Sequence, residues 1–487
     1  MKCIAVAVLF VIQSHRCLFA QEVNCSTVPN AASAKLLEVV SIVKTGNFRE
    51  LKSLLEASWS LDPQYADNIF PALRELEAIK SFSKGLSLVE MCTEGSTKAN
   101  GYYENGLTQA VDRFRIALDA STPPRITHIV VYRAERLKKE TRAGLTESER
   151  LANLDAYVHG LAKAGAFSGV VMLAKSGKPI YTKAFGKRFD GIPDTISLED
   201  PFDPVAFTAS FRAANRAPRV DIRTTDRFNL ASLNKIVTAV AILQLVERKK
   251  IGLDDRLRSL LPKEPMSDEV GEVQLKHLLS HTSGLKYDLQ SLSFTPGSAY
   301  AYNNFNFGLL GDIISAATGL RYDDYIRLHI LGPMGMANTA SIEFRRFNSQ
   351  VVIGNYEDIR GEEFVVSPNP YLQKYPGSAM GGMYSTADDL LRFAEGLRTH
   401  KLLQPASLGM MRAAKTELHA PNYGFGVMRG DGGIWGHSGR LPGADADLEI
   451  YGDSGFVAIV LANQSEANPP VLAKIRSLFW SEAIEPK

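Results

Sequence analysis

Four side chains between residues 232 and 437 have types and spacings that suit acyl transfer: Ser232, Lys235, Tyr302 and His437. Ser232 and Lys235 are three residues apart, so a helix places the amine beside the hydroxyl. A serine hydroxyl attacks a carbonyl when a neighbouring base takes its proton. An amine and a phenol can both handle that proton in a suitable environment. The set therefore predicts a serine nucleophile with lysine and tyrosine as proton-handling groups.

The pattern Ser-x-x-Lys is weak alone, because it occurs four times, at Ser41, Ser81, Ser232 and Ser283. An arbitrary match is more often a helix serine beside a surface lysine. Only Ser232 begins a long apolar stretch, which ends with the basic residues and glycine of residues 249–252. A serine in the first helical turn keeps its backbone N–H outside the helical hydrogen bonds, so that N–H can face an oxyanion. This context favours Ser232 as the reactive match.

The pattern Tyr-x-Asn occurs twice, at Tyr103 and Tyr302. Tyr103 lies in the polar sequence Tyr-Glu-Asn-Gly, which we interpret as a structural turn. Tyr302 follows a loop that contains Pro-Gly and precedes an apolar helical pattern, so its ring can be aimed at a cleft. A nearby ammonium would favour the phenolate of Tyr302. The alternative for Tyr302 is a packed aromatic side chain.

Residues from about 147 to 487 resemble the serine β-lactamase/penicillin-binding superfamily. This group includes class C β-lactamases, D-alanyl-D-alanine carboxypeptidases, D-aminopeptidases and β-lactamase-fold esterases. The resemblance rests on the reactive motifs and on three further segments, which are Leu278 to Leu285 (LLSHTSGL), Pro333 to Thr339 (PMGMANT) and Gly381 to Leu390 (GGMYSTADDL). The resemblance implies an antiparallel sheet flanked by helices, plus a helical region that carries Ser232 and Tyr302.

The resemblance also implies a role for each motif residue. Ser232 would form an acyl-enzyme, Lys235 would be the base or would tune it, and Tyr302 would relay the proton to the leaving group. Whether Lys235 or Tyr302 takes the first proton stays open. Asn304 would hold the substrate or orient Lys235. The backbone N–H groups of Ser232 and Arg440 would form the oxyanion hole.

The third motif departs from the Lys-Thr-Gly of many β-lactamases and carboxypeptidases, because this chain has His437, Ser438 and Gly439 there. A lysine is charged near neutral pH, whereas an unperturbed histidine is mostly neutral above about pH 6.5. The site therefore loses a permanent cation suited to a substrate carboxylate. Arg440 could restore a carboxylate clamp, or it could point to solvent. The alternative for His437 is a hydrogen-bonded strand histidine.

Other chemistries have less support in the sequence. No Gly-x-Ser-x-Gly motif indicates an α/β-hydrolase nucleophile. His277 and His281 share helical spacing, but the glutamate of a zinc protease does not lie between them, so we interpret both as structural. We expect no metal and no cofactor. A net charge of +2 without a basic run predicts no nucleic-acid partner. The sequence leaves the oligomeric state open.

Residues 1–20 have the pattern of a signal peptide, in which a lysine precedes an uninterrupted apolar run over residues 4–12. We expect cleavage after Ala20 or at a site close to it, because Leu18 is larger than the small residue favoured at its position. That run is too short to span a bilayer, and no later segment is long enough. Cleavage would leave Cys25 and Cys92 as a pair that can form a disulfide in an oxidising compartment. A periplasmic or secreted protein is therefore expected.

The mature chain divides near residues 135–147, and the expected fold class is α+β with several domains. Residues 21–140 combine helical periodicity with later strand alternation, which predicts a small α+β domain. Its pattern is similar to nuclear-transport-factor-2-like folds, and we expect it to bind or dimerise. Residues 147–487 would form the β-lactamase-like domain. Thr146 and Glu149 predict a capping box for its first helix. We expect the domain to begin with strands over residues 169–175 and 180–185 and to end with strands over residues 423–428, 434–437, 447–451 and 456–461. Its connection over residues 190–222 could roof the pocket or be a surface insertion.

These features predict a secreted serine hydrolase that acts through an acyl-enzyme on small esters, amides or D-amino-acid peptides. A β-lactamase or a D-alanyl-D-alanine carboxypeptidase is the alternative with the same chemistry. A catalytically slow protein that binds a ligand and senses it through the amino-terminal domain is the alternative of another class.

Overall fold

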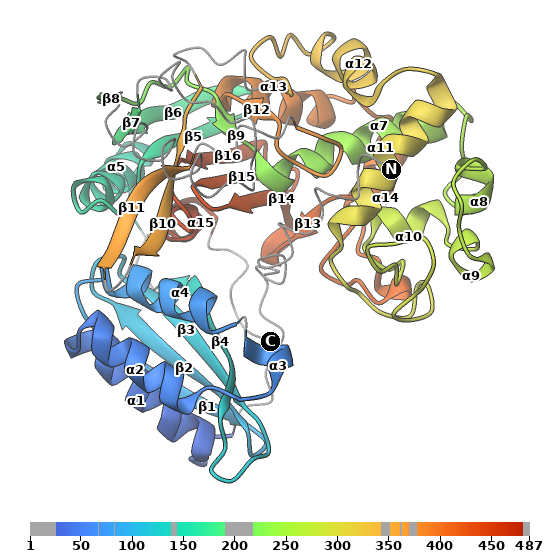
Figure 1. Ribbon diagram of the computed structural model, residues 1–487. Coiled ribbons are helices and arrows are strands. Elements are labelled where there is room, and N and C mark those ends of the chain that lie inside the picture. Colours follow the sequence, from blue (N-terminus) through green and yellow to red (C-terminus); the bar gives the residue numbers. More distant parts are fainter. Residues whose placement is uncertain are drawn as a thin grey trace.

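The computed structural model describes residues 26–480 except 67, 82, 138–143, 190–217, 342–350, 361–362 and 370–376. The predicted signal peptide and most of the 190–222 connection therefore lie outside the described residues. A small amino-terminal α+β domain precedes a larger domain in which helices flank an antiparallel sheet (Figure 1). The predicted fold class is confirmed. Across the described ranges, no helix combines the length and the apolar character that a membrane span requires.

The amino-terminal domain packs helices on one four-stranded antiparallel sheet. Its elements are α1 (Ala31–Thr45), α2 (Phe48–Ser58), α3 (Pro63–Ala66), α4 (Ile69–Ser81), β1 (Leu86–Glu94), β2 (Lys98–Asn105), β3 (Ala110–Leu118) and β4 (Ile126–Leu137). Leu36, Leu51 and Leu76 are fully buried in the core between the helices and the sheet. Tyr103, predicted to lie in a turn, is instead near the end of β2, where its ring packs edge-on against Phe114. The turn begins only after the strand ends, because Tyr103 and its neighbours still pair with β3.

Cys92 on the edge strand β1 is disulfide-bonded. The neighbouring Thr93 exchanges backbone hydrogen bonds of 2.8 and 3.2 Å with Ser26. The predicted partner of Cys92 is Cys25, which directly precedes Ser26 and lies outside the described residues. The beginning of the described chain is therefore held against β1.

A six-stranded antiparallel sheet forms the centre of the larger domain. In sheet order its strands are β13 (Met428–Arg429), β14 (Ile434–Leu441), β15 (Ala444–Tyr451), β16 (Phe456–Ala462), β5 (Gly169–Lys175) and β6 (Lys178–Phe185). Both faces of the sheet are apolar, because Val171 and Leu173 pack with α5 (Glu147–Lys163) and α15 (Asn468–Phe479), while Val170 and Met172 belong to the core of the helical region. Pairing of β16 with β5 joins the two ends of this domain.

Two boundaries in this domain differ from the sequence prediction and one agrees with it. The capping box that Thr146 and Glu149 predict is present at the start of α5. The strand expected over residues 423–428 is reduced to Met428–Arg429, because the N–H of Gly424 donates to the carbonyl of Val427 and closes a turn. The helix expected to begin at Ser232 begins with a 3₁₀ turn, Ala231–Asn234.

The helical region covers the face of the sheet opposite α5 and α15 (Figure 1). Its helices are α7 (Lys235–Glu247), α8 (Leu257–Leu260), α9 (Asp268–Gly271), α10 (Leu275–Leu279), α11 (Asn304–Thr318), α12 (Tyr322–Ile326), α13 (Ala387–Arg398) and α14 (Pro405–Arg412). The central helix is α7, which is buried from Lys235 to Leu245. A helix buried on every side can be apolar nearly all round, and the polar exceptions in this buried stretch are Lys235, Thr238 and Gln244.

Three further pairs of strands lie outside the main sheet in the described part of the larger domain. One of them joins β9 (Phe228–Asn229), just before the turn that holds Ser232, to β12 (Tyr384–Ser385). The pair β7 (Lys187–Phe189) and β8 (Arg219–Asp221) brings together the two ends of the undescribed segment 190–217. The hairpin of β10 (Gly354–Arg360) and β11 (Glu363–Asn369) extends towards the amino-terminal domain and contacts α4 (Figure 1). Helix α15 also contacts β4, and the hydroxyl of Tyr157 on α5 donates to the carbonyl of Thr108, so the two domains are in contact at several points.

Candidate active site

Ser232 and Lys235 are in direct contact, as their spacing predicted. The Nζ atom of Lys235 lies 2.8 Å from Ser232 Oγ and also donates to the backbone carbonyl of Met380. Lys235 is 0% exposed, and burial holds the pKa of its amine well below the usual value. A neutral amine can accept the proton of a serine hydroxyl. Ser232 is only partly buried, so a substrate can reach it.

The backbone around Ser232 is held by a second segment of the chain. Ala231 has a φ of +46°, which is unfavourable for a residue with a Cβ and persists only where neighbouring groups fix it. The N–H of Ala231 donates to Asn229 Oδ1 at 2.8 Å, and its carbonyl accepts from the N–H of Gly382 at 3.0 Å. The side-chain amide of Asn234 donates to the carbonyl of Ser378 at 2.9 Å. The segment around Gly382, which the sequence offered only as a family marker, therefore supports the serine turn.

Tyr302 lies on the loop before α11, with its ring centroid 5.2 Å from Lys235 Nζ. The structure thus brings the second motif to the Ser232–Lys235 pair. The ring of His281 lies against Tyr302, with centroids 4.2 Å apart. His281 had been interpreted as structural, and its contact with Tyr302 has no signal in the spacing of the sequence, because the two residues approach only through loop packing.

Asn304 is the first residue of α11, directly after the N-cap residue Asn303. Its Oδ1 is buried and has no hydrogen-bond partner within the described part of the chain. A buried amide oxygen without a donor costs stability, so such groups often mark binding sites. Asn304 is therefore placed to accept a hydrogen bond from a substrate or from a repositioned Lys235, and its role stays a prediction.

Strand β14 carries the third motif past the serine turn. Side chains alternate along a strand, so His437 and Gly439 share one face while Arg440 lies on the other. A Cβ on Gly439 would lie 2.0 Å from the Leu230 carbonyl oxygen and 2.8 Å from the Ser232 nitrogen, so only glycine permits this approach. The two N–H groups predicted for the oxyanion hole, those of Ser232 and Arg440, consequently belong to adjoining segments.

His437 is a buried, neutral histidine. Its Nδ1 lies 2.6 Å from the carbonyl oxygen of Ser438, which can only accept, so Nδ1 carries the hydrogen. Its Nε2 accepts from the hydroxyl of Tyr423 at 2.9 Å. Burial, with a smaller contribution from Lys235, lowers the pKa of His437 to about 3. The third motif therefore presents no cation at neutral pH. Tyr423 was not identified from the sequence.

Arg440 adopts neither of the orientations considered from the sequence, a clamp at the site or a side chain in solvent. Its guanidinium is 13% exposed and lies 3.4, 3.5 and 3.7 Å from carboxylate oxygens of Asp445, Asp447 and Glu466. Burial raises the pKa of Asp445 and of Asp447, and the charge of Arg440 opposes that rise. The side chain of Arg440 is therefore a counter-ion behind the strand, and only its backbone remains a candidate for the site.

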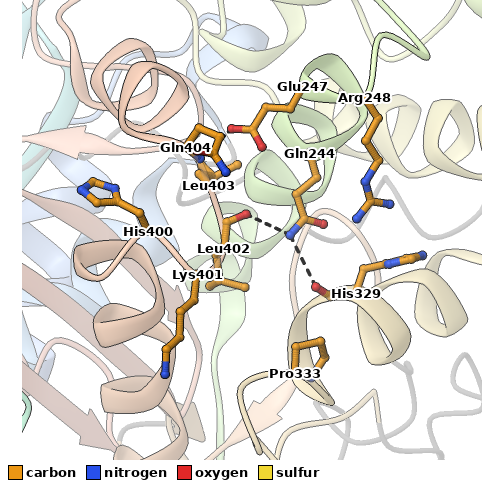
Figure 2. A pocket seen from close by; sticks show the side chains of 10 residues that line it. All are labelled: Gln244, Glu247, Arg248, His329, Pro333, His400, Lys401, Leu402, Leu403 and Gln404. Atoms are coloured by element: carbon orange, nitrogen blue, oxygen red, sulfur yellow. Dashed lines mark hydrogen bonds between the residues drawn. The ribbon is translucent and has the colours of Figure 1, made fainter.

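A separate pocket of about 300 Å³ lies at the far end of α7 (Figure 2). The amide of Gln244 is one of its lining groups and donates to the carbonyls of Leu402 at 3.1 Å and His329 at 3.4 Å. Lys235 and Gln244 are nine residues apart, which corresponds to about 14 Å along a helix. The walls mix the cation of Arg248 with the carboxylate of Glu247. This pocket is not part of the Ser232 site, and its charges favour no ligand class.

Known proteins resemble this chain over about half to two thirds of its length. The family model described as Beta-lactamase matches residues 154–479. A penicillin-binding protein of Bacillus subtilis (strain 168) is 28% identical over 308 residues, which are 54% of this chain and 66% of that protein. Esterase EstB of Burkholderia gladioli is 28% identical over 308 residues, which are 50% of this chain and 77% of the esterase. A solved penicillin binding protein from Bacillus halodurans has a TM-score of 0.53 and 25% identity, covering 66% of this chain and 99% of that chain.

Proposed function

Because the chain belongs to the Beta-lactamase family, we propose that it is a serine hydrolase that acts through an acyl-enzyme on small esters, amides or D-amino-acid peptides. The observation that carries this proposal is the 2.8 Å contact between Ser232 Oγ and the fully buried Nζ of Lys235. A buried amine in that position accepts the proton of the hydroxyl that attacks a carbonyl carbon. The similarity to an esterase and to penicillin-binding proteins is consistent with that chemistry.

The proposed cycle has two halves. As the bond from Ser232 Oγ to the carbonyl carbon forms, the hydroxyl proton passes to Lys235 or Tyr302. The bond to the leaving group then breaks, and Tyr302 delivers the proton to the leaving oxygen or nitrogen. Water later attacks the acyl carbon and gives a proton to the same base. The bond between that carbon and Ser232 Oγ then breaks, Oγ takes the proton, and the free acid leaves. Backbone N–H groups of Ser232 and Arg440 would stabilise both oxyanions.

The charges around the third motif favour substrates that carry no carboxylate. His437 is neutral, and its Nε2 is occupied by the hydroxyl of Tyr423. The guanidinium of Arg440 lies among three carboxylates on the opposite face of β14. Neither side chain can therefore balance a substrate carboxylate as the lysine of Lys-Thr-Gly could. Esters and amides without a carboxylate are accordingly preferred over β-lactams and free peptide termini.

A matched pair of peptides tests this preference. N-acetyl-D-alanyl-D-alanine and its carboxyl-terminal amide differ only in the charge near the scissile bond. We expect kcat/KM to favour the amide by at least about 10-fold. A hydrogen bond to a charged group contributes about 1.5–3 kcal/mol, and neither His437 nor Arg440 donates one to the carboxylate of the free acid. H437K should reduce that preference. A faster reaction of the free acid, or of nitrocefin over a neutral p-nitrophenyl ester, would instead favour a carboxypeptidase or a β-lactamase.

We further propose that the protein is secreted or periplasmic. The pattern of residues 1–20 supports this location, and so does the disulfide of Cys92, because disulfides persist in oxidising compartments. Expression of the full chain in a bacterial host should give an exported protein whose amino terminus is Gln21, as read by mass spectrometry. A cytoplasmic protein that retains Met1 would contradict this proposal.

A further inference from the structure

His281 is a buried residue with a left-handed backbone. It is 0% exposed and has a φ of +57°. Histidine tolerates this conformation better than most residues, but it is still unfavourable for a residue that has a side chain. Such a conformation persists when the surrounding groups determine it. At His281, these groups include the loop that carries Tyr302, together with the rings of Phe307 and Tyr423.

His281 accepts hydrogen bonds from the residue before Tyr302 and from the residue after it. The carbonyl of His281 accepts from the N–H of Ala301 at 2.9 Å, and its Nδ1 accepts from the N–H of Asn303 at 3.1 Å. Its ring also packs on Tyr302, with centroids 4.2 Å apart and planes tilted by 35°. One residue thus fixes the backbone before Tyr302, the backbone after it and the ring itself.

The protonation state of His281 is compatible with a role in holding Tyr302 in place. Because Nδ1 accepts a hydrogen bond, the hydrogen of the neutral ring is on Nε2. That Nε2 is buried and makes no hydrogen bond within the described ranges. Burial, with the nearby charge of Lys235, holds the pKa of His281 well below its usual value. The ring consequently stays neutral and places no positive charge beside the Lys235 amine.

We propose that His281 is a positioning residue that holds Tyr302 where its phenol can protonate the leaving group. This inference rests on the proposed hydrolase function and deepens it. Tyr302 must deliver a proton as the bond between the carbonyl carbon and the leaving oxygen breaks. An alkoxide is a much stronger base than p-nitrophenolate, so only the alkyl ester needs that proton. Displacing Tyr302 should therefore slow the alkyl ester selectively.

Two esters of one acid test the proposal, for example ethyl butyrate and p-nitrophenyl butyrate, which form the same acyl-enzyme. In H281A, kcat/KM for the ethyl ester should fall by about 10- to 100-fold, since small displacements of a catalytic group have effects of that size. The p-nitrophenyl ester should lose less than about threefold. H281N should fall less than H281A, because asparagine tolerates positive φ and its Oδ1 can accept from the N–H of Asn303.

A double-mutant cycle and a matched histidine complete the experiment. In a Y302F background, H281N should have no further effect on the ethyl ester, because its action passes through the Tyr302 hydroxyl. His277 is the matched control, since it is also buried and its Nδ1 also accepts a backbone N–H, that of Gln274 at 3.2 Å. H277N should leave the ratio between the two esters unchanged.

The outcomes separate this inference from the proposed function. A full additional loss in the Y302F background would overturn the positioning role while leaving the hydrolase intact. An equal loss on both esters in H281N would also overturn it where Y302F slows the ethyl ester alone, whereas Y302F itself slows both esters if Tyr302 is also the base. A wild-type protein whose Ser232 takes no covalent label would overturn the function itself. If H281A does not fold, H281N alone decides, because it should still change the ratio between the esters.

Discussion

Replacement of Ser232 by alanine is expected to abolish covalent labelling by a fluorescent phosphonate and to remove turnover. Loss of the nucleophile in a serine hydrolase costs on the order of 10⁶-fold in kcat. The fold should survive, because Ser232 is only partly buried and its hydroxyl contacts the amine of Lys235 rather than a structural group. Gel fluorescence, intact mass and the thermal midpoint of unfolding measure labelling, stoichiometry and fold in one preparation.

Ser283 provides the matched control, because it is another of the four Ser-x-x-Lys serines. It is 1% exposed, and its hydroxyl donates to Asn306 Oδ1 at 2.8 Å, which indicates a structural role. S283A should therefore keep the label and lose some stability. Labelling that persists in S232A at any other serine would overturn the assignment of the nucleophile.

The contact between Ser232 and Lys235 could be predicted because it is local. Residues i and i+3 lie on one side of an α-helix and eclipse each other in a 3₁₀ turn. The pair therefore meets even though the first turn is 3₁₀ rather than α-helical. The strands that bound the larger domain could be predicted for a similar reason, since their apolar runs and glycine-containing turns are also local signals.

Contacts made by distant segments could not be predicted from spacing. The carbonyl that accepts a hydrogen bond from the Lys235 amine belongs to Met380, which is 145 residues away in the sequence. Tyr423 reaches His437 because a turn replaces the strand that was expected over residues 423–428. In each case the partner has no sequence pattern of its own, and tertiary packing alone selects it.

The orientation of Arg440 is different, because the sequence did contain the signal. His437 and Arg440 are three residues apart, and an odd spacing places two side chains on opposite faces of a strand. Extending the expected strand beyond His437 would have placed Arg440 behind the sheet. Asp445 and Asp447 are two residues apart on the neighbouring strand, so their side chains lie on one face, which is the face that Arg440 occupies. Their charge and spacing therefore also indicated them as partners of the Arg440 guanidinium.

Replacement of Lys235 by methionine is expected to lower kcat/KM by about 10²–10⁴-fold, the usual contribution of a positioned base. Methionine fills a similar volume beside Phe307 without burying an unpaired charge, so the fold should persist. Since burial depresses the pKa of Lys235, wild-type activity should rise with pH through that depressed pKa, as the amine loses its proton. This acid limb should be absent in K235M. The pH dependence of kcat/KM on a neutral ester measures both effects.

The pH dependence of the free energy of unfolding tests the depressed pKa of Lys235 independently of activity. A lysine whose pKa is depressed by folding binds fewer protons in the folded state, so the free energy of unfolding should increase with pH between the folded pKa and about 10.4. K235M should lack this contribution. Urea unfolding at several pH values measures it without any assumption about the reaction, and an identical pH dependence in both proteins would mean that Lys235 is charged in the folded state.

Two further lysine variants distinguish proton acceptance from charge. K235R keeps a permanent cation that cannot accept the proton of Ser232, so it should be as inactive as K235M. Lys415 is a matched control, because it is 5% exposed, has a pKa lowered by burial and donates to the carbonyl of Met410 at 2.8 Å. K415M should keep the acid limb. Near wild-type activity in K235R would show that the site needs a positive charge beside Ser232, and Tyr302 would then be the remaining candidate for the base.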